Sequence, residues 1–182
     1  MSTPSWPPPG DVGEILIDTD TLGARVKELG NEIAADYAGR SPVLVSVLKG
    51  AICFVADLAR EIPLPVELEF MAVSSYGGTR STGAVKILKD LDVDVAGRDI
   101  LIVEDIVDTG LTLDYLLRIL GERRPASIEV CSLLVREVEG KPAPELRYVG
   151  FRLPPVFVIG YGLDVDGRYR NLPYVASYTG EA

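Results

Sequence analysis

Residues 100–117 read ILIVEDIVDTGLTLDYLL, and this stretch decides the fold. It begins with an unbroken apolar run, a pattern typical of a strand buried on both faces of a parallel sheet. Glu104 and Asp105 stand where that strand should end, and a turn of small and hydroxyl residues follows at 108–112. The apolar residues after the turn recur at the spacing of one helix face: Leu113, Leu116, Leu117 and Leu120. The sequence therefore predicts a strand, a tight turn and a helix in direct succession.

The turn at 108–112 is suited to bind a phosphate group. Backbone N–H groups converge at a helix N-terminus, the helix dipole adds partial positive charge, and the hydroxyls of Thr109 and Thr112 can donate. Glu104 and Asp105 would repel a bare phosphate, so they indicate a ligand with hydroxyl groups, a bound cation or both. A ribose 5-phosphate with Mg²⁺ meets these requirements. The alternative is an ordinary strand and turn with solvated acids, because short motifs also arise by chance.

The segment VEDIVDTGLT at 103–112 resembles the phosphoribosyl-pyrophosphate (PRPP) binding motif of the type I phosphoribosyltransferases. The flanking chain is similar to the hypoxanthine-guanine branch of that family, and the resemblance covers most of residues 22–174. It implies that Glu104 and Asp105 hold the ribose hydroxyls directly or through Mg²⁺, and that Asp108 accepts the purine proton as a general base. It also implies that the turn holds the 5-phosphate through these residues: Asp108, Thr109, Gly110, Leu111 and Thr112.

The pattern along the chain predicts an α/β fold with a mainly parallel central sheet flanked by helices. Apolar runs predict strands at 42–48, 66–73, 84–91, 127–135, 148–151 and 156–161, and helical spacing predicts helices at 21–37 and 51–61. Thr19 or Asp20 is the expected N-cap of the first helix. The resemblance adds a small base-binding hood formed by the C-terminal segment. Residues 1–13 are predicted to be a flexible, proline-rich tail, and residues 14–182 a single domain.

The composition of the 182-residue chain narrows the classes of function. The chain has 18 basic and 27 acidic residues, and its net charge of −9 works against non-specific binding to nucleic acid or anionic membranes. It has no histidine, which excludes imidazole catalysis and imidazole metal ligation. Cys53 and Cys131 lie in apolar segments without CxxC spacing, so we expect core residues in a reducing compartment. With no apolar stretch long enough to span a membrane and no leader-like N-terminus, the cytoplasm is the expected location.

Lys49 and Gly50 form a second candidate site, at the end of the strand predicted over 42–48. Ligands of open parallel sheets gather at the carboxyl ends of the strands, so Lys49 is expected on the same rim as Thr109. The resemblance assigns Lys49 and Gly50, with Arg170, to pyrophosphate binding, and it implies that the peptide before Lys49 can be cis. A solvated loop lysine and a surface arginine are the alternatives.

Residues 74–83, SSYGGTRSTG, show no apolar periodicity and predict a loop. Composition leaves open a simple hairpin connection between two strands. The resemblance implies instead that Ser75 and Tyr76 belong to a lid that closes over the reaction centre. A lid has a physical purpose there, because water would otherwise capture the cation-like anomeric carbon.

The segment around Phe157 resembles the base pocket of the family. It implies that Phe157 stacks on the purine, that the backbone of Val158 reads the base edge, and that Asp164 helps to hold a second Mg²⁺. Strand alternation makes at least one of Phe157 and Val158 a core residue, and Asp164 is also a common turn former. Arg136 departs from the family, which usually places a lysine there to contact the six-position oxygen of the base. Arginine is forked and longer, so it can shift base preference, or it can simply point to solvent.

The resemblance, together with these features, implies a Mg²⁺-dependent purine salvage enzyme that transfers phosphoribose from PRPP to N9 of hypoxanthine or guanine. The products would be IMP or GMP and pyrophosphate, and Mg²⁺ would be held by Glu104, Asp105 and Asp164. A xanthine-preferring or other-base transferase is one alternative, and a PRPP-binding regulator without turnover is another. The expected partners are PRPP and a 6-oxopurine, not nucleic acid or membranes. The family resemblance also implies a homo-oligomer, a dimer or tetramer.

Overall fold

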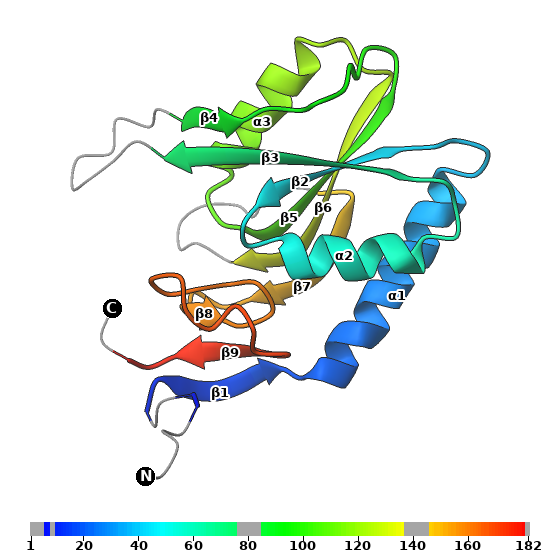
Figure 1. Ribbon diagram of the computed structural model, residues 1–182. Helices are drawn as coiled ribbons and strands as arrows, with labels where there is room; N and C mark the ends of the chain where they lie inside the picture. The colour runs from blue at the N-terminus through cyan, green and yellow to red at the C-terminus, as the bar shows by residue number, and fades with distance from the viewer. Residues whose placement is uncertain (1–5, 8–9, 76–84, 137–145, 181–182) are drawn as a thin grey trace.

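Two sheets organise the part of the chain that the computed structural model describes, residues 6–7, 10–75, 85–136 and 146–180 (Figure 1). The larger sheet has six strands, and every neighbouring pair is parallel except its edge pair β4 and β3. The expected mainly parallel sheet is therefore confirmed. Its strands, from edge to edge, are β4 (Val85–Lys89), β3 (Glu67–Ser75), β2 (Val43–Leu48), β5 (Asp99–Val107), β6 (Ser127–Arg136) and β7 (Tyr148–Leu153).

Helices cover both faces of this sheet. Helices α1 (Thr19–Asp36) and α2 (Ile52–Glu61) pack on one face, and α3 (Leu111–Gly121) packs on the other (Figure 1). Helix α1 begins two residues earlier than expected, because the carboxylate of Asp18 accepts the N–H of Thr21 at 2.7 Å and acts as the N-cap.

Strand β5 lies inside the sheet, between β2 and β6. Residues 100–103 have no exposed surface, because the helices on the two faces bury alternate side chains. This arrangement explains why the apolar run at its start does not alternate with polar residues. The strand therefore delivers its acidic end and the following turn to the rim of a rigid core.

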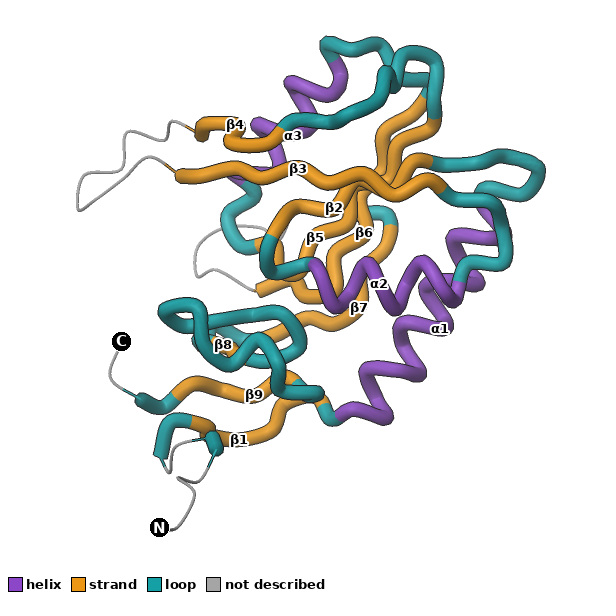
Figure 2. Tube along the Cα trace, viewed as in Figure 1, coloured by secondary structure: helices purple, strands orange, loops and turns teal. Residues whose placement is uncertain are grey.

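A second, three-stranded antiparallel sheet forms the hood, with the order β1 (Val12–Ile17), β9 (Val175–Tyr178) and β8 (Val158–Ile159). The sequence analysis missed β1 and β9, and it predicted a longer strand where β8 has two residues. The hood is therefore not built from the C-terminal segment alone, because β1 from the N-terminal part of the chain lies beside β9 from the C-terminal part (Figure 2). Val12 and Gly13, assigned to the tail, belong to this sheet, and Trp6 stacks on Tyr169 with ring centroids 5.3 Å apart.

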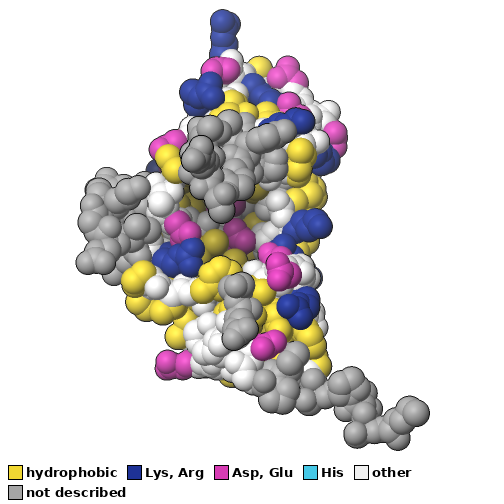
Figure 3. Space-filling view, turned by 90° about the vertical axis from the view of Figure 1, so that its left-hand side faces the viewer, with side chains coloured by type: hydrophobic (Ala, Val, Ile, Leu, Met, Phe, Trp, Pro, Cys, Tyr) yellow, Lys and Arg dark blue, Asp and Glu magenta, His cyan; other side chains and the backbone are white. Residues whose placement is uncertain are grey.

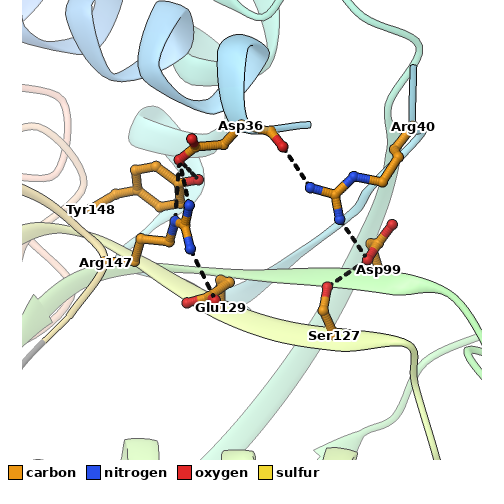
Figure 4. A network of polar contacts seen from close by, with 7 residues as sticks. All are labelled: Asp36, Arg40, Asp99, Ser127, Glu129, Arg147 and Tyr148. Atoms are coloured by element: carbon orange, nitrogen blue, oxygen red, sulfur yellow. Dashed lines mark hydrogen bonds and ion pairs between the residues drawn. The ribbon is translucent and has the colours of Figure 1, made fainter. Parts of the chain in front are cut away.

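A polar network ties the amino ends of the strands to the end of α1 (Figure 4). Asp36 accepts the hydroxyl of Tyr148 at 2.7 Å and pairs with Arg147 at 2.9 Å. Arg40 donates to the backbone oxygen of Asp36 and pairs with Asp99 at 3.1 Å. Burial and the Asp36 carboxylate raise the pKa of Tyr148. These contacts fix the starts of β5 and β7 on α1, at the end of the sheet opposite the turn at 108–112.

The structure also bears on two expectations from composition. Cys53 and Cys131 are both free thiols, and burial raises the pKa of Cys131 far above its usual value. Cys131 is a core residue, as expected, whereas Cys53 is only partly buried, so the expectation of a core position is wrong for Cys53. Within the described ranges, no helix combines the length and the apolar character that crossing a membrane requires.

Candidate active site

The candidate site lies where the carboxyl ends of the parallel strands face the hood. Figure 3 looks onto this side of the molecule and shows acidic and basic side chains gathered around a hollow between the sheet and the hood. Loops after β2 and β5, the end of β6 and the segment around β8 all reach this region. Parallel α/β sheets place their ligands at this rim.

The turn between β5 and α3 forms a pocket of its own. Residues 106–113 line it together with Glu104. Gly110 is the N-cap of α3 and has a φ of 78°, a left-handed conformation that glycine adopts without steric penalty. The first backbone N–H groups of α3 are consequently available at the pocket, and the helix dipole favours an anion there. The local geometry is that of a phosphate site.

Glu104 and Asp105 point to different neighbours, as successive residues of a strand do. Glu104 lines the pocket of the turn and is only 6% exposed. Burial, and then the neighbouring charge of Asp105, raises the pKa of Glu104 well above its usual range. Burial also raises the pKa of Asp105, although the Ile106 N–H that it accepts at 2.8 Å and the charge of Arg170 act in the opposite direction. Both acids lie where hydroxyl donors or a cation would stabilise the ionised form.

The loop of Lys49 and Gly50 meets the carboxylate of Asp105. The peptide between Leu48 and Lys49 is cis, as the family resemblance implied. Lys49 is exposed to solvent at the end of β2, on the same rim as the turn. A Cβ placed on Gly50 would lie 1.6 Å from Oδ2 of Asp105, so any side chain at this position would displace the acid. The loop and the acidic end of β5 therefore form one packed unit.

Gly162 brings the hood onto the same unit, and the sequence analysis did not identify it. Its φ is 100°, and an added Cβ would lie 2.0 Å from the carbonyl oxygen of Gly50. The segment YGLDVDG at 161–167 is rich in glycine and aspartate, which was a signal for tight backbone geometry. Nothing in this segment indicated that Gly162 packs against Gly50.

Arg170 and Asp164, both predicted site residues, are paired with each other. Nη2 of Arg170 lies 2.5 Å from Oδ1 of Asp164, and Nη1 donates to the carbonyl oxygen of Gly162 at 2.5 Å. The other carboxylate oxygen of Asp164 accepts the N–H of Gly167 at 2.7 Å. Their charges also act on Asp105, with Arg170 lowering its pKa and Asp164 raising it. These contacts hold Arg170 beside the loop of Lys49 and Gly50.

Arg136 and Asp108, predicted for base recognition and proton transfer, also meet. Nε of Arg136 donates to Oδ1 of Asp108 at 2.7 Å, and Nη2 donates to Oδ2. Nη1 donates to the carbonyl oxygen of Val156 at 3.0 Å. The hydrogen bond and the charge of Asp108 raise the pKa of Arg136 further. Arg136 thus points toward the turn, and the alternative of a purely solvated arginine is wrong.

Phe157 and Val158 have separate roles in the hood. The side chain of Val158 is buried in the core, whereas Phe157 is 49% exposed. The ring of Phe157 meets that of Tyr178 edge-on, with centroids 6.0 Å apart, and leaves aromatic surface toward solvent. As alternation required, one of the pair is a core residue. Only the backbone of Val158 remains as a candidate for contact with a base.

The predicted lid is only partly described. Ser75 is the last residue of β3, and Tyr76 lies outside the described residues. Apart from Phe157 and Val158 in the hood, the remaining predicted residues fall into two packed groups at the rim. One is the turn with Glu104, which Arg136 joins through Asp108, and the other is the loop of Lys49 and Gly50 with Asp105, Arg170 and Asp164.

The donor set at this rim fits Mg²⁺. Within the described ranges, no cluster of three acidic, cysteine or histidine side chains would hold an ion by itself. Mg²⁺ does not require one, because it commonly takes one or two carboxylates and completes its shell with water and phosphate oxygens. Glu104 and Asp105 supply two such carboxylates, and their raised pKa values mark positions that a cation would stabilise. The residues present therefore fit a metal ion shared with a phosphorylated ligand.

Comparison with known proteins gives one consistent family. A family model described as a phosphoribosyl transferase domain matches residues 14–166. A hypoxanthine-guanine phosphoribosyltransferase of Mycobacterium avium is 51% identical over 185 residues, covering 96% of this chain and 91% of that protein. The protein of the same name from Bacillus subtilis strain 168 is 48% identical over 166 residues, covering 91% of this chain and 92% of that one.

Solved structures agree with the sequence comparisons. A crystal structure of a hypoxanthine-guanine phosphoribosyltransferase from Bacillus anthracis has a TM-score of 0.87 and 42% identity, and the match covers 92% of this chain and 99% of that chain. A hypoxanthine phosphoribosyltransferase from Staphylococcus aureus gives the same TM-score and identity over 92% of each chain. The likeness therefore extends over nearly the whole chain.

Proposed function

This chain belongs to the phosphoribosyl transferase family, and we propose that it transfers the 5-phosphoribosyl group of PRPP to N9 of hypoxanthine or guanine. The bond between C1 of the ribose and the pyrophosphate oxygen breaks, and a bond from C1 to N9 forms. One proton leaves the purine, and IMP or GMP and pyrophosphate are the products. The observation that carries this proposal is an anion pocket at the start of α3 directly beside the buried carboxylate of Glu104 and the partly buried carboxylate of Asp105.

The pocket between β5 and α3 holds the 5-phosphate of PRPP. Backbone N–H groups of residues 108–112 and the hydroxyls of Thr109 and Thr112 donate to its oxygens. Glu104 and Asp105 accept from the ribose hydroxyls, directly or through Mg²⁺. Their raised pKa values support this role, because hydroxyl donors and a cation both favour the ionised carboxylate.

The pyrophosphate leaves toward the loop of Lys49 and Gly50. Lys49 and Arg170 stabilise the negative charge that develops on the leaving oxygens, and electrostatic stabilisation of this kind is usually the largest single contribution to catalysis. Mg²⁺ would be held by Glu104, Asp105 and Asp164, and when bound it neutralises phosphate charge as a Lewis acid. Since Arg170 is paired with Asp164 at 2.5 Å, a ligand that engages Asp164 frees donors of Arg170 for the pyrophosphate.

Asp108 accepts the purine proton. It lines the pocket at the end of β5, and no histidine in the chain competes for the role. A carboxylate at this position can take a proton from the base as N9 bonds to C1. Its pairing with Arg136 supports this assignment, because the carboxylate is held at the rim next to the hood.

The hood supplies the purine site. The exposed face of Phe157 stacks on the base, an interaction worth about 1 to 3 kcal/mol. The backbone of Val158 contacts the base edge, and Arg136 donates to the six-position oxygen. Ser75 and Tyr76 close over the bound substrates and exclude water, which prevents hydrolysis of PRPP.

A xanthine-preferring transferase is the second candidate function. Arg136 is the observation that favours it. The family usually has a lysine at this place, and a forked guanidinium presents its donors differently from an ammonium. The mechanism would be unchanged and only the preferred base would differ. We further propose that the protein acts in the cytoplasm as a homo-oligomer, as the resemblance implies.

An ultraviolet assay tests the proposal. PRPP and Mg²⁺ are supplied with hypoxanthine, guanine, xanthine and adenine in separate reactions. Turnover of hypoxanthine or guanine is the expected result. Turnover of xanthine alone would keep the mechanism and change the specificity. No turnover of any base, with PRPP binding intact, would overturn the transferase function in favour of a PRPP-binding regulator.

A further inference from the structure

The contacts of Arg136 reach three elements at once. Its side chain starts at the end of β6, its Nε and Nη2 groups hold both carboxylate oxygens of Asp108, and its Nη1 group holds the carbonyl oxygen of Val156. Asp108 belongs to the turn after β5, and Val156 directly precedes the exposed ring of Phe157. One guanidinium therefore connects the proton acceptor to the aromatic platform of the base site.

The ion pair is partly shielded from water. The side chain of Arg136 is 24% exposed and that of Asp108 is 33% exposed. A bidentate pair fixes both the position and the plane of a carboxylate, which a single hydrogen bond does not. The orientation of Asp108 is thus set before any substrate arrives.

Lysine could not make the same set of contacts. An ammonium is a point charge on one nitrogen, so it cannot hold two carboxylate oxygens side by side and reach a carbonyl oxygen from a separate arm. Arginine has five N–H donors, and three are used in the contacts to Asp108 and Val156. Among the described residues, no acceptor contacts the two N–H groups that remain, so a ligand can accept from them. Holding Asp108 and contacting a base are therefore compatible for an arginine.

We propose that Arg136 is a positioning residue for Asp108, in addition to any contact it makes with the base. Arg136 holds the carboxylate of Asp108 in the orientation that accepts the purine proton. It also fixes the position of that carboxylate relative to the ring of Phe157. This inference rests on the proposed transferase function, because it concerns the proton acceptor of that reaction. It assigns Arg136 an effect on the chemical step, which base binding alone would not give it.

A double-mutant cycle tests the proposal. Values of kcat/KM for hypoxanthine are measured at saturating PRPP and Mg²⁺ for the wild type, Asp108→Asn, Arg136→Met and the double variant. Each single substitution is expected to lower kcat/KM about 10²-fold. If Arg136 acts through Asp108, its loss adds little once the proton acceptor has been removed. The coupling is the product of the two single-variant losses in kcat/KM divided by the loss in the double variant. A coupling of tenfold or more supports the proposal, and a coupling below tenfold overturns it.

Arg136→Lys provides a second readout if Arg136→Met does not fold. Lysine keeps a donor for the base but loses the bidentate hold on Asp108. We expect kcat to fall about tenfold while KM for hypoxanthine stays within about threefold. A rise in KM with unchanged kcat would overturn the positioning role, because it would place the whole effect of Arg136 in base binding.

A matched control separates this role from general effects of replacing an arginine. Arg118 pairs with Glu122 at 3.4 Å on the exposed side of α3, away from the site. Arg118→Lys is expected to leave both kinetic constants unchanged. Absence of turnover in the wild type would overturn the transferase function itself, whereas wild-type turnover with a coupling below tenfold overturns only the positioning role.

Discussion

Substituting Gly162 by alanine is expected to displace the loop of Lys49 and Gly50. The added Cβ would lie 2.0 Å from the carbonyl oxygen of Gly50, where ordinary contacts begin at 3.4 Å. Either the hood segment or the loop must move by more than about 1 Å to relieve this overlap. Because Gly50 itself packs against the carboxylate of Asp105, the displacement reaches the acidic end of β5.

The magnitude follows from two separate effects. Gly162 has a φ of 100°, so an alanine there would be strained by roughly 1 to 3 kcal/mol, which lowers Tm by about 2 to 4 °C for each kcal/mol. Misplacing catalytic groups by about 1 Å costs on the order of 10²-fold in rate. We therefore expect Gly162→Ala to lower kcat/KM for PRPP about 10²-fold and to lower Tm by several degrees.

Gly167→Ala is the matched control. Gly167 lies in the same hood segment with a φ of 78°, but an added Cβ there would have no atom within 4 Å. Gly167→Ala therefore measures the effect of backbone strain alone, without a steric overlap between the hood and the loop of Lys49 and Gly50. Steady-state kinetics for PRPP and thermal unfolding would be measured for both variants and the wild type.

The two variants should differ mainly in activity. Gly167→Ala is expected to lose stability and retain kcat/KM within about threefold, since alanine keeps the backbone N–H that Asp164 accepts and its Cβ has no atom within 4 Å. If Gly162→Ala lowered Tm by the same amount as Gly167→Ala and also kept its activity, the contact between the two glycines would not position the pyrophosphate loop.

Three further predictions concern single groups. Asp108→Asn should retain PRPP affinity, measured by calorimetry, while kcat falls on the order of 10² to 10⁴-fold; an unchanged kcat would remove Asp108 from the chemistry. Replacing Glu104 and Asp105 together by glutamine and asparagine should weaken PRPP binding at least tenfold, because the acceptors for the ribose hydroxyls and Mg²⁺ lose their charge; unchanged affinity would contradict the ribose assignment. Tyr148→Phe removes the hydrogen bond of 2.7 Å to Asp36 and should lower Tm by about 4 °C at neutral pH. The pKa of Tyr148 is raised in the folded state above its ordinary value of 10. The hydrogen bond of Tyr148 therefore contributes its full stabilisation below pH 10, and this stabilisation is lost as the pH rises through the raised pKa. The Tm difference between wild type and variant should therefore shrink above pH 10, and a constant difference up to pH 12 would refute the assigned pKa direction.

The central strand and turn could be predicted because their signals are local. The apolar run at 100–103 shows burial on both faces, and the acids and hydroxyl residues that follow it indicate the chemistry of the rim. The parallel sheet, the packing of the helices and the anion pocket agree with those signals. The roles of Ser75, Tyr76 and the other site residues stay predictions that the proposed experiments address.

The hood could not be predicted in full, because its pairing is not local. Strand β1 is short, and its partner β9 lies more than a hundred residues away in the sequence. β8 contributes only two residues, too few for a periodic signal. The first two residues of β1 were therefore assigned to the tail and the rest was not recognised as a strand, although β1 forms one edge of the sheet beside the base site.

The sequence by itself determined which residue types stand at the rim: carboxylates at the end of one strand, a lysine and glycine at the end of another, and an arginine at the end of a third. The tertiary structure decided how they combine. It placed Gly162 against Gly50, Gly50 against Asp105, and Arg136 on both oxygens of Asp108. The physical reason is that periodicity and turn propensity depend on neighbouring residues, whereas these contacts join segments that only the packing of the sheet and hood brings together.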